Sequence, residues 1–152
     1  EGKTSLLNII LGLRGYDSGT VLKHEKLHLL TVFQEDRLFP SFDALDNIGI
    51  YPYPFVKETA LEILKKLELG DVCDRPAAEY SGGMKRRVAI ARALLAEYDI
   101  LIMDEPLQGL DAETKEKVAT VIKTQTAGKT VLFVTHDEKE AEFFEAECME
   151  LV

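Results

Sequence analysis

Three residues near the start of the chain have the types and spacing that bind phosphate. Gly2, Lys3 and Thr4 open a segment whose apolar residues recur at helical spacing. In such a loop, backbone N–H groups and the lysine surround the β- and γ-phosphates of a nucleotide, and the threonine hydroxyl binds Mg²⁺. The three residues alone are more often an ordinary helix cap, so their meaning depends on the motifs further along the chain.

A pair of carboxylates comes directly after the apolar run 100–103. This run predicts a strand that is buried on both faces and that ends in Asp104 and Glu105. Ligands of open α/β sheets bind at the carboxyl ends of the strands. There Asp104 would hold Mg²⁺ directly or through water, and Glu105 would orient or deprotonate an attacking water. On these two residues alone, an acidic pair that only solvates a turn remains an open alternative.

A third group, Ser81, Gly82 and Gly83, opens a predicted helix over 81–96. The serine hydroxyl, the exposed backbone N–H donors and the positive end of the helix dipole together make an anion site. The sequence therefore holds two candidate phosphate sites and one candidate metal site, in a fixed order along the chain.

In this order the three groups resemble the ATPase subunit of the ABC (ATP-binding cassette) family, and the resemblance covers essentially the whole chain. It implies family roles for these residues: Gly2, Lys3 and Thr4, with Ser5 beside them, in the Walker A loop, and Gln34 in the Q-loop; Ser81, Gly82 and Gly83 in the signature motif; Asp104 and Glu105 in Walker B, Asp111 in the D-loop, and His136 as the switch histidine.

The resemblance also implies the cofactors, which are ATP and Mg²⁺. Glu105, His136 and Gln34 are the expected catalytic residues, and Gln34 joins Thr4 and Asp104 at the metal. The remaining positions are expected to bind the nucleotide. His24 and His28 match no motif and receive no role.

The implied fold is α/β, a P-loop NTPase with a mostly parallel sheet flanked by helices and an inserted helical subdomain. We expect one ABC ATPase domain over 1–152, with a RecA-like core at 1–39 and 97–152 and the helical subdomain at 40–96. The first Walker A glycine, the strand before it and the aromatic residue that stacks on adenine are absent from the sequence. A complete subunit is therefore expected to be longer at both ends.

Three residues depart from the family pattern. Tyr80 and Met84 replace the leucine and glutamine of the signature, while the serine and both glycines are kept. Gln108 stands where many members have a small residue. We expect the signature changes to alter rate or packing rather than to abolish function, and Gln108 to affect signalling through the D-loop.

The elements that must position these residues alternate between strands and helices, which predicts a parallel sheet with right-handed crossovers. The expected helices cover 3–13, 44–48, 56–69, 81–96, 112–125 and 137–147; the expected strands cover 20–22, 27–33, 99–104 and 130–135, with a further strand starting near 148.

The composition is that of a globular domain. The chain has 152 residues, of which 46% are hydrophobic and 30% charged, and its net charge of −9 disfavours nucleic acid as a partner.

Cys73 and Cys148 match neither a disulfide scaffold nor a metal site and are expected to be reduced thiols. The basic run from Lys85 to Arg87 is interpreted as a solvated helix face.

The function that the resemblance implies is the ATP-hydrolysing subunit of an ABC transporter, on the cytoplasmic face of the membrane. Its expected partners are a second copy of itself, transmembrane permease subunits and a solute-binding protein. The stretch from Phe33 to Pro40, followed by Asp46 to Ile48, looks like bacterial importers of the nitrate, sulfonate and taurine type. Two alternatives stay open: a non-transport ABC ATPase in repair, translation or iron-sulfur assembly, and a regulatory nucleotide-binding module without turnover.

Overall fold

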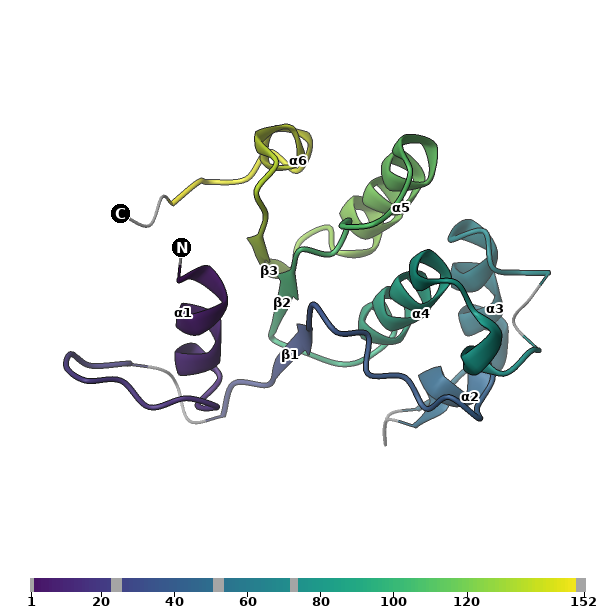
Figure 1. The fold of residues 1–152 in the computed structure, drawn as a ribbon, viewed down its shortest axis with the longest axis horizontal. Helices are drawn as coiled ribbons and strands as arrows, with labels where there is room; N and C mark the ends of the chain where they lie inside the picture. Colours follow the sequence, from purple (N-terminus) through teal and green to yellow (C-terminus); the bar gives the residue numbers. More distant parts are fainter. Residues whose placement is uncertain (1, 23–25, 51–53, 72–73, 150–152) are drawn as a thin grey trace.

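The computed structural model describes residues 2–22, 26–50, 54–71 and 74–149, and it consists of strands and helices in alternation (Figure 1). The strands are β1 (Leu29–Val32), β2 (Ile100–Asp104) and β3 (Thr130–Val134). The helices are α1 (Lys3–Ile10), α2 (Ala44–Gly49), α3 (Lys57–Lys66), α4 (Gly82–Leu94), α5 (Ala112–Gln125) and α6 (Glu138–Phe143), with a 3-10 turn at Ala77–Glu79.

The three strands form one parallel sheet in the order β1-β2-β3. The central strand β2 is apolar up to its final residue and pairs on both sides, which explains its near-complete burial. Because all three strands run in the same direction, their carboxyl ends meet at one edge. Asp104 lies opposite Val134 at this edge.

Helices cover both faces of the sheet, with α1 on one side and α4 and α5 on the other (Figure 1). Successive side chains of β2 alternate between the faces. Ile102 packs with Leu7 of α1, whereas Leu101 and Met103 belong to the larger core on the other side. The larger core includes Ile90 of α4. The structure thus confirms the predicted α/β fold with a parallel sheet flanked by helices.

Helices α2 and α3 pack against each other and against α4, on the side of α4 away from the sheet (Figure 1). Leu64 of α3 and Val88 and Ile90 of α4 are completely buried in this group. Apolar residues at helical spacing predict this burial in α3, whose charged residues point to solvent.

Four predicted helices, α1, α3, α4 and α6, end two to four residues earlier than expected, and left-handed residues explain this in α3 and α6. Helix α3 stops at Lys66 because Glu68 takes a left-handed conformation (φ +57°) and Leu69 donates its N–H back to the Leu64 carbonyl at 2.8 Å. Helix α6 stops at Phe143 for a similar reason, since Glu145 has φ +52°.

The predicted strand over 20–22 is wrong. These residues form no strand. The Leu22 side chain is 91% exposed, so it does not pack against the sheet or a helix. The predicted strand near 148 does not begin at Cys148 or Met149 either, and its remainder lies outside the described residues. Cys148 is a free, exposed thiol, whereas Cys73 and His24 lie outside the described part of the chain.

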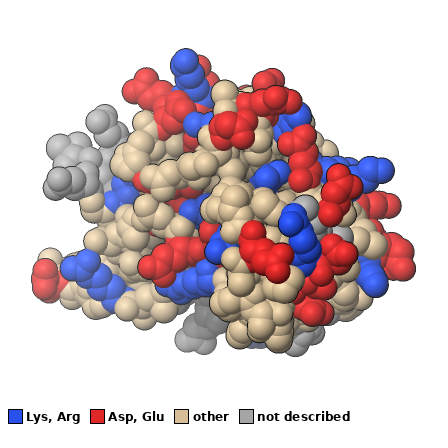
Figure 2. Space-filling view, turned by 45° about the vertical axis from the view of Figure 1, so that its right-hand side comes forward, with Lys and Arg blue, Asp and Glu red and all other residues tan. Residues whose placement is uncertain are grey.

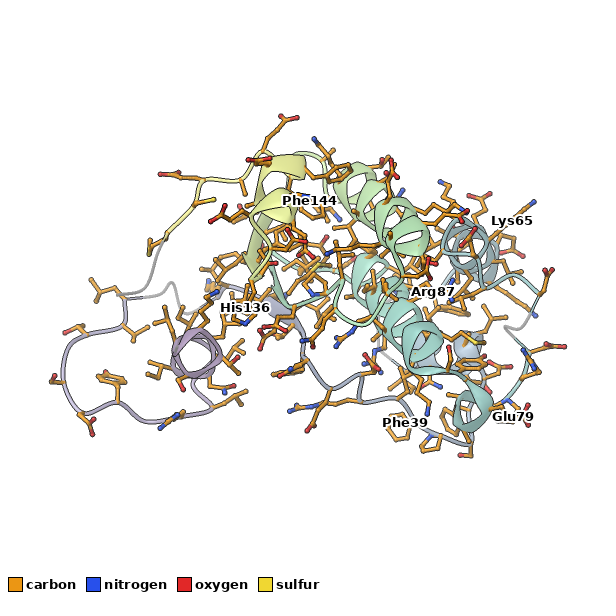
Figure 3. All side chains as sticks on the ribbon, turned by 45° about the horizontal axis from the view of Figure 1, so that its top comes forward. Phe39, Lys65, Glu79, Arg87, His136 and Phe144 are labelled. Carbon is orange, nitrogen blue, oxygen red and sulfur yellow. The ribbon has the colours of Figure 1, made fainter. Side chains whose placement is uncertain are left out.

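The solvated-face interpretation of Lys85 to Arg87 is wrong for both arginines. Arg86 is buried and donates hydrogen bonds to the main-chain carbonyls of Phe33 and Gln34. Arg87 donates to the carbonyl of Leu67 at 2.9 Å, on the side of α4 that faces α3 (Figure 3). Main-chain carbonyls offset the cost of removing these guanidinium groups from water, and a charge pattern alone does not reveal such acceptors.

Charged side chains of both signs are spread over the face drawn in Figure 2. Among the residues that the structure describes, no helix has both the length and the apolar character needed to cross a bilayer.

Candidate nucleotide-binding site

The first turn of α1 brings a lysine to the carboxyl edge of the sheet. Gly2 caps the helix with φ +90°, a conformation that glycine adopts at little cost. Lys3 Nζ lies 2.8 Å from the Thr135 carbonyl, to which it donates, and 3.2 Å from Nδ1 of His136. Figure 3 shows His136 beside α1 at this end of the sheet. The positive charge of Lys3 thus sits where β3 ends.

A hydroxyl and a buried carboxylate meet beside this lysine. Thr4 Oγ1 donates to Oδ2 of Asp104 at 3.0 Å, although 100 residues separate the two in the chain. Asp104 is only 4% exposed. Hydroxyl and carboxylate oxygens are the protein ligands that Mg²⁺ uses, so this donor set fits the metal.

The next residue, Glu105, pairs with His136. Its Oε1 lies 2.5 Å from His136 Nε2. The Glu105 side chain is 14% exposed and that of His136 is 73% exposed. The backbone of Glu105 has φ +49°, and its N–H donates to the Val134 carbonyl at 2.9 Å. This strained turn directs the carboxylate away from β2 and towards the end of β3.

Gln34 lies just after β1, the third strand to end at this edge. Its side-chain amide donates to Oε1 of Gln108 at 3.3 Å. Arg86 holds the carbonyls of Phe33 and Gln34 from the other side. Gln108, which the sequence marks as a departure from the family pattern, is therefore the side-chain partner of Gln34.

Ser81, Gly82 and Gly83 form a separate group at the start of α4. Ser81 caps the helix, accepting the Met84 N–H at 3.2 Å. A Cβ on Gly82 would meet nothing, whereas one on Gly83 would lie 3.3 Å from Cδ2 of Leu110. No hydrogen bond between described residues joins this group to Lys3, and Glu79 just before it lies well away from His136 in Figure 3. Ser81 and Gly82 are both exposed.

Asp111 and Ser5 each have a local partner. Asp111 caps α5 by accepting the N–H of Thr114 at 3.0 Å and its hydroxyl at 2.7 Å. These hydrogen bonds, the backbone bond first, lower the pKa of Asp111 below its ordinary value. The Ser5 hydroxyl accepts a hydrogen bond from Arg14, in the segment after α1, at 2.9 Å.

Beside the acidic pair lies an open hollow, lined on one side by Glu105, Gln108 and Gly109 and on the other by Thr135 and His136. Lys115 and Glu140 also line it, and motif matching assigns no role to either. Their spacing offers the only signal, since each comes four positions after a motif residue, Lys115 after Asp111 and Glu140 after His136.

The family model for the ABC transporter family matches residues 1–108. A spermidine/putrescine import ATP-binding protein of Haemophilus influenzae is 34% identical over 92% of this chain and 42% of its own length. An aliphatic sulfonates import ATP-binding protein of Yersinia pestis is 39% identical over 92% of this chain and 55% of its own length. The chain therefore spans about half the length of these curated relatives, or less.

The fold is also that of a solved ATP-binding cassette. A dimeric cassette in a post-hydrolysis state, bound to ADP and Pi, superimposes with a TM-score of 0.74 at 32% identity, covering 93% of this chain and 73% of that one. The phosphate-type helix start, the acidic pair and the histidine meet at one sheet edge in this chain. By the family match and by this arrangement, the chain belongs to the ABC transporter family.

Proposed function

We propose that this chain is the ATP-binding and ATP-hydrolysing part of the subunit that powers an ABC transporter. The observation that carries the proposal is the meeting of Lys3, Thr4, Asp104, Glu105 and His136 at the carboxyl edge of the sheet. These residues come from three separate parts of the chain. Lys3 supplies a cation, Thr4 and Asp104 supply oxygen ligands for a metal, Glu105 supplies a base, and His136 supplies a further polar group. Phosphoryl transfer to water needs these groups.

Each residue has a distinct role in the proposed reaction. Lys3 binds the β- and γ-phosphates together with the N–H groups of the first turn of α1, which begins at Gly2. Thr4 and Asp104 would hold Mg²⁺, with Gln34 approaching from the end of β1. A bound Mg²⁺ would supply positive charge that stabilises the phosphate oxygens during transfer.

Glu105 acts on the attacking water. Its carboxylate accepts a hydrogen bond from that water, and so orients it or takes its proton. In the structure, the carboxylate is paired with His136 at 2.5 Å. When a γ-phosphate lies between them, His136 donates to the phosphate oxygen and Glu105 is left to the water.

A second copy of the chain completes the site. Ser81, Gly82 and Gly83 lie at the N-terminus of α4. No hydrogen bond between described residues joins their backbone N–H groups to the residues around Lys3. A helix N-terminus of this kind binds an anion. We propose that it binds the γ-phosphate held by Lys3 of the partner, with Asp111 beside the contact, as in a head-to-tail homodimer.

The helices over 40–96 would pass the motion to a permease, with 1–39 and 97–152 as the RecA-like core. Phe39 and Phe42 stack with ring centroids 5.4 Å apart and are 50% and 40% exposed. The buried Asn47 fixes this loop, since it accepts the N–H of Phe39 at 2.8 Å and donates to the carbonyls of both phenylalanines. An ordered, exposed aromatic pair suits a protein partner.

The relatives support an importer at the cytoplasmic face of a membrane. One is named for spermidine and putrescine, another for aliphatic sulfonates and a third, from Agrobacterium fabrum, for Fe(3+) ions. We propose that this chain likewise serves an importer, with permease subunits and a solute-binding protein as partners. The sulfonate type fits best with the loop from Phe33 to Pro40.

The test is the substitution Glu105→Gln in the natural full-length protein. The amide keeps the size of the side chain but cannot take a proton, so ATP binding should persist while the release of phosphate falls by about 10² to 10⁴. Equilibrium binding of labelled ATP and steady-state phosphate release measure the two effects. The matched control is Glu113→Gln, at an exposed carboxylate that pairs with Lys117 on the surface of α5.

Two results would overturn the proposal. If Glu105→Gln hydrolysed ATP as fast as the parent protein, the assignment of the base would be wrong. If the parent protein bound ATP without turning it over, the chain would be a regulatory nucleotide-binding module instead.

A further inference from the structure

We propose that Lys115, Glu140 and Thr135 form a polar brace that positions His136. Lys115 is a positioning residue in this arrangement, because it acts through the turn that carries the histidine. The inference rests on the proposed function, in which His136 contacts the γ-phosphate.

The brace is a continuous set of short contacts around the turn 135–137. Lys115 Nζ lies 2.6 Å from Oε1 of Glu140 and 2.9 Å from Oδ2 of Asp137. The other carboxylate oxygen of Glu140 accepts the Thr135 hydroxyl at 2.6 Å. That hydroxyl in turn accepts the Asp137 N–H at 3.0 Å. The residues before and after His136 are therefore both held from the side of α5.

Apolar packing holds this turn only weakly. Strand β3 has already ended at Val134, and α6 has six residues of which none is buried. The His136 side chain is 73% exposed. Polar contacts must therefore fix the place of the histidine, and the brace supplies those that do not involve the phosphate-binding residues themselves.

The brace is more sheltered than the neighbouring ion pairs on the same helix. The Glu140 side chain is 11% exposed and that of Lys115 is 30% exposed. Lys117, two residues along α5, pairs with Glu68 and Glu113 at similar distances, but all three of these side chains are more than 40% exposed. Sheltered pairs are screened less by solvent, so Lys115 should matter where Lys117 does not.

Helix α5 also connects the brace to the D-loop. Asp111 caps the helix, and its carbonyl accepts the N–H of Lys115 at 2.8 Å, one turn later. The hydrogen bonds to Glu140 and then to Asp137 raise the pKa of Lys115, so the amine stays charged through the neutral range. The position of the α5 start is thereby linked to the position of His136.

The first experiment compares Lys115→Met with Lys117→Met in the natural full-length protein. We expect Lys115→Met to lower kcat for ATP hydrolysis by about tenfold or more, because a displaced catalytic group loses its orientation. The KM for ATP should change by less than about threefold, since Lys3 and Thr4 are untouched. Lys117→Met should leave both constants near those of the parent, and Lys115→Arg, which keeps the charge, should restore part of kcat.

The second experiment separates positioning from general destabilisation. Single-turnover release of labelled phosphate is measured for His136→Ala with and without Lys115→Met. If Lys115 acts through His136, its substitution should have little further effect once the imidazole is gone. Glu140→Gln, which keeps the shape of the side chain, should behave like Lys115→Met in both backgrounds.

The inference fails if Lys115→Met leaves kcat unchanged, or if it lowers the rate equally with and without His136. The failure of the proposed function has a different signature. In that case the parent protein itself would bind ATP without hydrolysing it, whatever residue stands at position 115.

Discussion

Glu105 combines a strained backbone with the carboxylate on which the proposed reaction depends. Its φ of +49° lies in the left-handed region, which costs a residue with a Cβ about 1–2 kcal/mol. The strain is maintained because the Glu105 N–H bonds to the Val134 carbonyl at 2.9 Å and the preceding Asp104 is buried in the sheet edge. The left-handed backbone therefore lowers the stability of the fold, and it orients the Glu105 carboxylate towards His136.

This strain predicts an inverted order of stability at position 105. Glu105→Gly should be more stable than Glu105→Ala by about 0.5–1 kcal/mol, because relief of the left-handed conformation exceeds the entropy cost of glycine. Urea unfolding of the two variants measures the difference. The same two substitutions at Glu116, an exposed position inside α5, should give the opposite order. An alanine variant as stable as the glycine variant at 105 would contradict the strain.

Residue types and order along the chain were enough to predict the pairing of Thr4 with Asp104. Parallel strands end at one edge, so a helix start and a strand end 100 residues apart were expected to meet. The contact of Gln34 with Gln108 could not be predicted in this way, because an amide on an exposed loop carries no pattern. The brace around Lys115 was missed for a similar reason, since its parts look like ordinary surface charges.

At the scale of elements, Arg86 ties helix α4 to the segment after β1. Its guanidinium donates to two main-chain carbonyls and lies 3.3 Å from the Asp36 carboxylate. Burial raises the pKa of Asp36 above its ordinary value, although Arg86 acts in the opposite direction. The ion pair therefore does not fully offset the cost of burying the carboxylate.

This imbalance predicts unequal effects for the two partners. Arg86→Met should destabilise the fold by about 2–4 kcal/mol, since it leaves the Asp36 carboxylate without its ion-pair partner and two main-chain carbonyls without a donor. Asp36→Asn should cost much less, and adding it to Arg86→Met should restore part of the loss. Urea unfolding gives all three values, with Lys85→Met as a neighbouring cation that should cost less than about 1 kcal/mol. If Arg86→Met and Lys85→Met lowered the free energy of unfolding equally, Arg86 would not hold α4 to the segment after β1.

The helices and strands that carry the site were predictable because each has a clear apolar period, as β2 and α5 do. The segment over 20–22 was not, because a short apolar run has no period of its own. The ends of the helices could not be predicted either. Helix α3 ends where Glu68 takes a left-handed conformation, and the sequence has no glycine there to signal it.

At the scale of the whole molecule, the two candidate phosphate sites do not meet within one chain. Lys3 lies at the sheet edge beside His136, and Ser81 caps a helix whose start makes no hydrogen bond to that group within the described residues. A symmetric pair of chains resolves this, because each copy then supplies the part that the other lacks. A related cassette at 32% identity was solved as a dimer.

The most direct test of a shared ATP site is the activity of mixed dimers of the natural full-length protein. Lys3→Ala alone and Ser81→Arg alone should both be nearly inactive, because each homodimer has two damaged sites. An equal mixture should regain up to about one quarter of the parent turnover, since half of the dimers then hold one intact site. Phosphate release from a mixture that is as inactive as its components, beside an active parent protein, would contradict the account.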